Sequence, residues 1–261
     1  MSTALAADNL SRTFQRNGQT IKAVDGVSFS LAAGETLGIV GPSGSGKSSL
    51  ARLLLRLIEP DAGQIRFQGR DFLALGGREL RRARRGLQMV FQDPLAAFNP
   101  RASVFGALSD PLRTHGIVPR GEHADTIATL LSDVGLAPEL ARRAIHELSG
   151  GQRQRVAIAR AMATRPDVIV LDEAVSALDV TIRARILELL ARLQRETGVS
   201  YIFISHDLAV VRVISHRIAV MRDGRIVETG ESDAVLSNPS SAATRALIAA
   251  IPRLATTGAV S

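Results

Sequence analysis

A chain of 261 residues is long enough for one large domain or for a core that carries a subdomain. The absence of cysteine excludes disulfides and thiolate metal sites, and no apolar run reaches the length of a membrane helix. A formal charge of +7 could indicate binding to nucleic acid or to an anionic membrane face, but most arginines are scattered and only 3% of residues are aromatic. We therefore favour a solvated or phosphate-facing basic surface, densest at residues 78–85, over a nucleic-acid groove.

The first part of the chain is predicted to form strands and then a strand–loop–helix unit. Residues 4–31 alternate in polarity, which indicates two or three antiparallel strands with a turn at residues 16–18. Thr36–Val40 reads as a buried strand and Ser49–Ile58 as a helix. The apolar face predicted for that helix consists of Leu50, Leu53, Leu54 and Leu57.

The middle of the chain changes character. Gly63–Gly69 predicts a short strand, Glu79–Arg85 a helix and Leu87–Phe91 another strand. From residue 93 to about 147 the strand pattern stops, and prolines separate segments with helical spacing such as Ala124–Val134. This pattern predicts a helical insertion in an α/β core.

The last part returns to alternating helices and strands. A long helix is expected at Ser149–Thr164 and an amphipathic helix at Thr181–Thr197. Two short helices are expected to close the chain. Strands are expected at Asp167–Leu171, Tyr201–Ile204 and Arg217–Met221, the last followed by a turn at Asp223-Gly224.

The segment Gly41-Pro42-Ser43-Gly44-Ser45-Gly46-Lys47-Ser48 fits the phosphate-binding pattern G-x-x-x-x-G-K-[ST]. Glycines let the backbone N–H groups wrap an anion, and the following helix start, at Ser49, adds positive partial charge. Lys47 is one of two lysines in a chain that otherwise uses arginine. It can reach the β- and γ-phosphates of a nucleotide, and Ser48 can hold Mg²⁺. A plain glycine-rich turn is the alternative, and the flanking strand and helix argue against it.

Two adjacent acids come directly after a buried strand. Val168-Ile169-Val170-Leu171 ends in Asp172 and Glu173. In a parallel sheet, ligands bind beyond the carboxyl ends of the strands. Asp172 is therefore placed to orient Mg²⁺ and Glu173 to polarise an attacking water. A solvated turn is the alternative, but it would rarely come after four such apolar residues.

A second helix start offers another phosphate site. Leu148-Ser149-Gly150-Gly151-Gln152 opens the long helix, with free N–H groups, a hydroxyl and the positive end of the dipole. One chain needs only one such cradle for each γ-phosphate. We therefore expect each cradle to close over the nucleotide of a second subunit, although Ser-Gly-Gly alone is often only a helix cap.

On these motifs the chain resembles ATP-binding cassette (ABC) ATPases, the nucleotide-binding subunits of ABC transporters. The resemblance covers residues 4–252 as one ABC ATPase domain. It implies an α/β fold, a P-loop NTPase (RecA-like) core at 4–92 and 165–252 with an N-terminal antiparallel β-subdomain. A helical ABC insertion would occupy about 93–164, and we expect a disordered tail at 253–261.

The resemblance also implies roles for single residues. Phe14 would stack on adenine, with a packed strand residue as the alternative, and Gln92 would reach Mg²⁺ and the attacking water. His206 would contact the γ-phosphate, and Ser176 and Asp179 belong to a loop that crosses the dimer interface. The implied cofactors are ATP and Mg²⁺. The implied ATP-binding residues are Phe14, Gly41, Pro42, Ser43, Gly44, Ser45, Gly46, Lys47, Ser48, Ser49 and Gln92, with Ser48, Gln92 and Asp172 for Mg²⁺.

The segments Phe91–Arg101 and Asp172–Asp179 resemble those of ATPases in oligopeptide, dipeptide and nickel importers. The resemblance implies a transport ATPase that works with a second ABC subunit, two membrane-spanning permeases and, indirectly, a solute-binding protein. It implies a peripheral position on the cytoplasmic face of the inner membrane, and the chain start shows no signal peptide. The iron–sulfur cluster proposed for some relatives is not carried over, because cysteine is absent.

Two other classes fit the sequence less well than a transporter subunit. Soluble ABC proteins of translation or DNA repair typically carry tandem cassettes, a long coiled coil or zinc-binding cysteines, which this sequence does not show. An ordinary P-loop kinase or GTPase does not account for Ser149–Gln152, and neither lysine lies in a guanine-reading segment.

Overall fold

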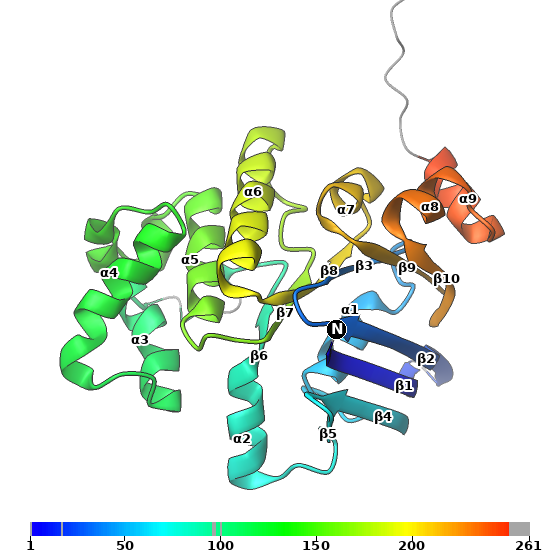
Figure 1. Cartoon of the computed structure of the whole chain (residues 1–261), viewed down its shortest axis with the longest axis horizontal. Helices are drawn as coiled ribbons and strands as arrows, with labels where there is room; N and C mark the ends of the chain where they lie inside the picture. The colour runs from blue at the N-terminus through cyan, green and yellow to red at the C-terminus, as the bar shows by residue number, and fades with distance from the viewer. Residues whose placement is uncertain (1, 17, 96–97, 100, 251–261) are drawn as a thin grey trace, which may run out of the picture.

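The computed structural model describes residues 2–16, 18–95, 98–99 and 101–250. Within that part, the strands form two sheets, and helices surround the larger sheet and extend to one end (Figure 1). Asn17 of the predicted turn and the predicted tail at residues 253–261 lie outside the described residues.

The larger sheet has the order β10-β9-β3-β8-β7-β6 among the described strands. All of its neighbours pair in parallel except β9 and β10, which are antiparallel. Every residue of β3, β7 and β8 is buried, because helices cover both faces of a parallel sheet. Its strands are β3 (Thr36–Val40), β6 (Leu87–Val90), β7 (Val168–Asp172), β8 (Ser200–Ser205), β9 (Arg217–Arg222) and β10 (Arg225–Glu231).

The smaller sheet is antiparallel, in the order β2-β1-β4-β5. Residues 4–31, predicted as two or three strands, form the two long strands of a hairpin. Apolar side chains such as Leu5, Leu10 and Leu31 pack with Leu50 and Leu54 in one core. The strands of this sheet are β1 (Thr3–Arg16), β2 (Gln19–Ala32), β4 (Ala62–Phe67) and β5 (Arg70–Asp71).

The helices fall into two groups. Those of the first group pack around the sheets: α1 (Lys47–Leu54), α2 (Gly77–Gly86), α6 (Val180–Thr197), α7 (Leu208–Ile214), α8 (Ser232–Ser237) and α9 (Ala242–Ala249). The second group lies between β6 and β7 in the chain and extends to one side of the molecule in Figure 1: α3 (Val104–His115), α4 (His123–Asp133) and α5 (Gly150–Met162). Short 3₁₀ turns connect α3, α4 and α5.

The predicted end of the first helix was wrong. The sequence predicts Ser49–Ile58, whereas α1 ends at Leu54 and Leu57 is 50% exposed. Arg56 takes a left-handed φ of 52°, and the N–H of Leu57 turns back to the carbonyl of Arg52 at 2.8 Å. A left-handed residue with this reverse hydrogen bond ends a helix. The left-handed residue is usually glycine, and because it is an arginine here, the sequence does not indicate the helix end. The bounds of the other predicted elements differ by one or two residues. The sequence did not predict β5 and α7, and Pro111, one of the prolines expected to separate helical segments, lies inside α3.

The last helix is attached to the sheet by one carboxylate. Glu228 of β10 accepts hydrogen bonds from the N–H groups of Ser240 and Ser241 at 2.7 and 3.0 Å, and from the hydroxyls of Ser240 and Thr244. Partial burial acts to raise the pKa of Glu228, but these four donors outweigh it and lower the pKa to about 2. The carboxylate therefore stabilises the start of α9 in its ionised form.

We expect Glu228→Gln to loosen α9. The pKa of Glu228 in the folded protein lies below the ordinary value of 4.5. The stabilisation of α9 by this carboxylate is therefore complete above pH 4.5 and is lost as the pH falls toward about 2. Losing a charge-assisted acceptor should lower the local stability of α9 by about 1–2 kcal/mol. Hydrogen exchange of the α9 amides measures this. Glu231→Gln on the same strand is the control, and equal exchange in both variants would contradict the assignment.

Candidate functional site

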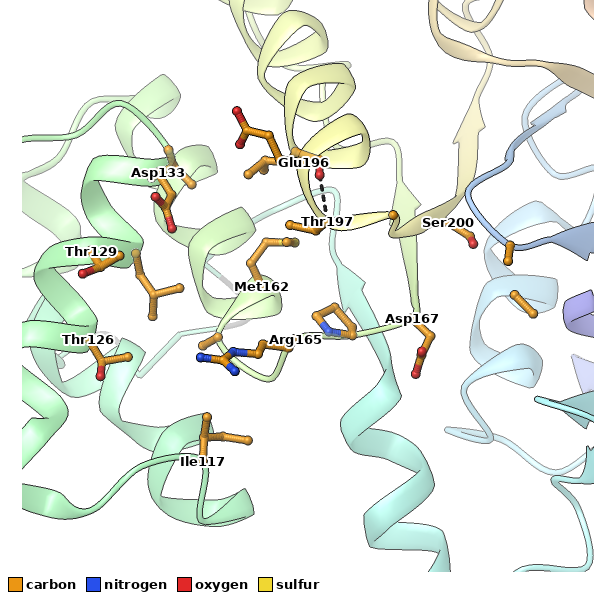
Figure 2. Close-up of a pocket in the computed structure, with 18 of the residues that line it drawn as sticks. Ile117, Thr126, Thr129, Asp133, Met162, Arg165, Asp167, Glu196, Thr197 and Ser200 are labelled. Carbon is orange, nitrogen blue, oxygen red and sulfur yellow. Dashed lines mark hydrogen bonds between the residues drawn. The ribbon is translucent and has the colours of Figure 1, made fainter. Parts of the chain in front are cut away.

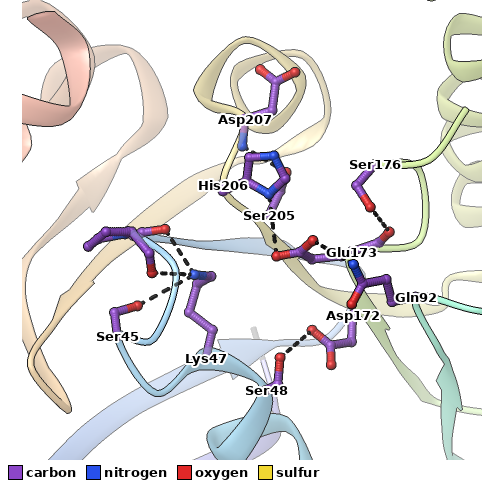
Figure 3. Close-up of polar contacts among 12 residues, drawn as sticks. Ser45, Lys47, Ser48, Gln92, Asp172, Glu173, Ser176, Ser205, His206 and Asp207 are labelled. Carbon is purple, nitrogen blue, oxygen red and sulfur yellow. Dashed lines mark hydrogen bonds and ion pairs between the residues drawn. The ribbon is translucent and has the colours of Figure 1, made fainter. Parts of the chain in front are cut away.

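The phosphate-binding loop joins β3 to α1, as the sequence predicts. Lys47 is the first residue of α1 and is only 6% exposed. Its Nζ donates to the carbonyl oxygens of Gly41 and Pro42, both at 2.9 Å, and lies 3.5 Å from Ser45 Oγ (Figure 3). Burial lowers the pKa of Lys47, while the negative charges of Glu173 and Asp172 oppose that shift. The ammonium is thus held inside the loop.

Close backbone packing fixes the shape of the loop. Gly46 has a φ of 103°, and a Cβ there would lie 2.1 Å from the carbonyl oxygen of Ala23 in β2. Gly44 also has a positive φ, 80°, but open space surrounds its missing side chain. Only glycine combines a positive φ with the absence of a Cβ, and residue 46 requires both.

Asp172 lies at the carboxyl end of β7, beside the start of α1. The hydroxyl of Ser48 donates to its Oδ1 at 3.2 Å (Figure 3). Burial raises the pKa of Asp172, and the hydrogen bond from Ser48 opposes that shift. Two residues that are distant in the sequence thus bring a hydroxyl and a carboxylate oxygen together.

Glu173 is the centre of a second polar cluster. Its Oε2 accepts a hydrogen bond from Gln92 Nε2 at 3.2 Å, and its Oε1 lies 3.3 Å from His206 Nδ1 (Figure 3). Its backbone has a φ of 48°, an uncommon conformation, and its N–H donates to the carbonyl of Ile204 in β8. The strand end thereby aims the carboxylate at Gln92, just beyond β6, and at His206, just beyond β8.

The second predicted cradle lies apart from this cluster. Ser149 caps α5, accepting from the N–H of Gln152, and the amide oxygen of Gln152 accepts from the N–H of Ser149. Ser149 and Gly150 are exposed, whereas Leu148 is buried and Gly151 packs against Ile182. Within one chain, no described contact joins residues 148–152 to Lys47 or Glu173.

The two residues predicted for the interface loop also have local partners. The hydroxyl of Ser176 donates to the carbonyl of Glu173 at 2.9 Å. Asp179 caps α6 by accepting from the N–H of Ile182 at 2.9 Å. Both contacts hold the turn after Glu173 in place.

A groove of about 580 Å³ runs along the phosphate-binding loop. Its walls include residues that sequence reasoning did not assign to the site. They are Ile21, Lys22 and Ala23 of β2 and the turn residues Asp223 and Gly224. Both lysines of the chain therefore border the same groove, and the rarity of lysine was the one signal for Lys22. The turn could not be placed there by sequence spacing.

Phe14 does not line that groove in this structure. It is half-buried in β1 opposite Ile21, and the guanidinium of Arg12 lies 5.2 Å from the centre of its ring. Arg12 in turn pairs with Asp61 at 2.7 Å. These are contacts within the small sheet, and the adenine contact of Phe14 stays a prediction.

A larger cavity, of about 830 Å³, lies elsewhere. It separates α4 and the end of α5 from the end of α6 and the start of β7, with Asp133, Met162, Arg165 and Thr197 around it (Figure 2). No residue of the predicted motifs lines it. We therefore regard it as a gap between the helical group and the sheet.

Comparison with known proteins points to the same residues. The sequence family described as ABC transporter matches residues 24–176, which contain the phosphate-binding loop, Asp172 and Glu173. This chain belongs to the ABC transporter family. ATP hydrolysis coupled to transport is the general activity of that family, and its members bind ATP. None of the described helices combines the length and apolarity that a membrane crossing demands.

Two curated relatives are similar over most of this ABC chain. The glutathione import ATP-binding protein GsiA of Escherichia coli (strain K12) is 53% identical over 232 residues, which are 89% of this chain. This chain spans only 37% of the length of GsiA. The probable peptide ABC transporter ATP-binding protein y4tS of Sinorhizobium fredii is 51% identical, over 92% of this chain and 68% of y4tS.

Solved ABC structures have the same fold. The cbiO1 structure from Clostridium perfringens, part of the ABC transporter complex cbiONQ, matches with a TM-score of 0.79 and 26% identity, over 91% of this chain and 92% of that one. The ATP-binding cassette MJ0796, a dimer bound to ADP and Pi, matches with a TM-score of 0.78 and 29% identity, over 87% of this chain and 98% of that one. The predicted fold class is therefore confirmed.

We expect Gly46→Ala to damage the site far more than Gly44→Ala. The added methyl group at residue 46 meets a backbone oxygen and forces a strained φ, which should cost about 2–4 kcal/mol in free energy of unfolding. At residue 44 only the φ is strained, at about 1–2 kcal/mol. Urea unfolding and ATP titration measure both variants. Similar losses in the two would contradict this account of the loop.

Proposed function

We propose that this chain is the nucleotide-binding subunit of an ABC importer, in which ATP hydrolysis in a head-to-tail dimer powers uptake of a small solute. The observation that carries the proposal is the cluster at the carboxyl edge of the large sheet. Lys47, Ser48 and Asp172 meet there with Gln92, Glu173 and His206. These residues come from segments as far apart as β3 and β8, so the cluster is a product of the fold.

The residues of the cluster suit the steps of phosphoryl transfer to water. Lys47 would exchange its loop carbonyls for the β- and γ-phosphates, with its ammonium already desolvated. Glu173, between Gln92 and His206, would accept a proton from the attacking water. His206 would contact the γ-phosphate, and Phe14 stays a proposed adenine contact that would require Arg12 to move from its ring.

The site fits Mg²⁺ in its donor atoms. Ser48, Asp172 and Gln92 offer hydroxyl, carboxylate and amide oxygens, which are the ligands that this hard cation prefers. No group of three or more His, Cys, Asp or Glu residues suited to a metal occurs among the described residues. In nucleotide sites Mg²⁺ is usually held by one or two carboxylates together with phosphates. When bound, Mg²⁺ would neutralise charge on the β- and γ-phosphates.

The exposed start of α5 would complete the site of a second subunit. Ser149 and Gly150 are exposed, and the Ser149 hydroxyl and free N–H groups suit a γ-phosphate. The dimeric MJ0796 structure supports such pairing. Ser176 and Asp179 would lie at this interface, and the partner could be a second copy or a related chain.

Domain movement would connect hydrolysis to transport. We propose a core of residues 4–92 and 165–252 and a helical subdomain of about 93–164 that rotates about Gln92. A groove of about 300 Å³ between β6 and the end of α3, with Phe91 and Pro94 at its rim, could seat a permease segment. Two permeases and a solute-binding protein would complete the transporter, with this chain peripheral on the cytoplasmic face of the inner membrane.

The named relatives favour a peptide-like cargo. GsiA is named for glutathione import and y4tS for peptides, and neither name mentions nickel, so nickel transport stays a prediction. The alternative of a non-transport ABC ATPase in translation or repair is not favoured by these relatives. Cargo selection would rest with the solute-binding protein.

We expect Glu173→Gln to abolish turnover while ATP binding persists. An amide cannot accept the proton of the attacking water, so the hydrolysis rate should fall by about 10²–10⁴-fold. The ATP-bound dimer should then accumulate and appear in size-exclusion chromatography with ATP. Glu188→Gln, at an exposed position on α6, is the control. Full turnover in Glu173→Gln would remove Glu173 from its proposed role.

We expect Ser149→Asp to block hydrolysis without weakening ATP binding to the separate chain. The new carboxylate would face the partner's γ-phosphate, and like-charge repulsion should lower turnover by about 100-fold. ATPase assays and nucleotide titration separate the two effects. Ser132→Asp, at an exposed position on α4, adds the same charge outside the site. An unchanged rate in Ser149→Asp would argue against completion of the site in trans.

A further inference from the structure

Helix α2 presents a concentrated positive surface that the catalytic cluster does not use. Its ten residues include five arginines, and four of them are exposed. We call Arg78, Arg81, Arg82 and Arg85 the arginine surface. The helix follows the loop after β5 and leads directly into β6 (Figure 1), and its partly buried Leu80 and Ala83 attach it to the core.

The charges of the arginine surface are not neutralised within the chain. None of its members forms an ion pair with any described residue, and the side chains of Arg78, Arg81 and Arg82 make no described hydrogen bond. Arg84, the fifth arginine of α2, differs because it donates to the carbonyl of Arg56 at 2.8 Å. Arg85 also donates, from Nε to the carbonyl of Thr164 at 3.4 Å. Arg78, Arg81 and Arg82 thus remain available for an external anion.

Neighbouring segments extend this positive charge. A hollow of about 640 Å³ between α2 and β5 has four arginines in its walls, namely Arg70, Arg82, Arg85 and Arg165. Two acids, Glu79 and Asp167, also line it but form no ion pair with them or with other described residues. The wall therefore carries a net positive charge spread over three parts of the chain.

Helix α2 also borders the groove proposed above for a permease segment. Arg84 lines that groove, as does His115 at the end of α3. Burial and the positive charges of Arg85 and Arg81 lower the pKa of His115, so these arginines lie within electrostatic reach of the groove. If the groove faces the membrane, α2 lies beside the membrane-facing surface, and this orientation rests on the proposed function.

We propose that the arginine surface binds the phosphate headgroups of anionic phospholipids and holds the subunit against the bilayer. Its arginines, at residues 78, 81, 82 and 85, are spaced by three or four residues and therefore lie along one side of α2. A folded acidic protein would need a matched row of carboxylates along that side. A fluid leaflet supplies phosphates to all of them by rearrangement, and guanidinium groups bind phosphate well.

Flotation of the purified chain with vesicles tests the proposal. We expect binding to vesicles of equal parts phosphatidylglycerol and phosphatidylcholine, but not to pure phosphatidylcholine. Each basic residue near an anionic leaflet raises partitioning by roughly five-fold, so R78Q/R81Q/R82Q should lower it by about a hundred-fold. Binding of the unmodified chain should also be lost at about 1 M NaCl, where the screening length is about 3 Å.

The matched control is R120Q/R142Q/R195Q, which removes the same charge from exposed arginines outside α2 that form no described ion pair. It should retain binding, and ATPase activity should be normal in both variants. Equal binding by the two variants, insensitivity to salt, or no binding of the unmodified chain to the anionic vesicles would overturn the proposal. The last result would leave an acidic protein as the partner. The vesicles contain no permease and the assay needs no ATP. A failure of vesicle binding can therefore be told apart from a failure of the proposed function, which the Glu173→Gln variant tests.

Discussion

Parallel pairing of β3, β8 and β7 is the constraint on which the site depends. In a parallel sheet all strands end at the same edge, so the loop after β3, the acids that end β7 and the histidine after β8 converge without any local sequence relation. The register adds detail, because Asp172 pairs with Ile204, whose carbonyl then holds the N–H of Glu173. Full burial of these strands leaves little freedom to shift them.

Much of this arrangement could be predicted from sequence where chemistry and local pattern coincide. The loop at Lys47 and the strand ending in Asp172 each carry their own signal. Contacts between distant segments could not be predicted from the sequence. No residue near Arg56 indicates its left-handed turn, and none near Asp223 indicates that Asp223 borders the groove along the phosphate-binding loop. Phe14 is a different case, because its match to a family motif could not predict that the guanidinium of Arg12 lies over its ring.

The two predicted phosphate cradles differ in how far one chain satisfies them. Lys47 has three oxygen neighbours in its own loop, and its environment is closed. Ser149 is satisfied only by its own helix turn, and its free face is turned to solvent. A site completed by a partner needs this asymmetry, because one half must be preorganised while the other stays accessible.

The segment shared with the family ends at Ser176, yet strands beyond that residue support the loop. Strand β3 lies between β8 and β9, both of which come later in the chain, and the N–H of Gly224 donates to the carbonyl of Ser45 at 3.0 Å. The smallest fragment able to fold around a nucleotide must therefore extend well past the shared segment, to the hairpin that closes the sheet. In this protein the motif and the cooperative folding unit have different boundaries.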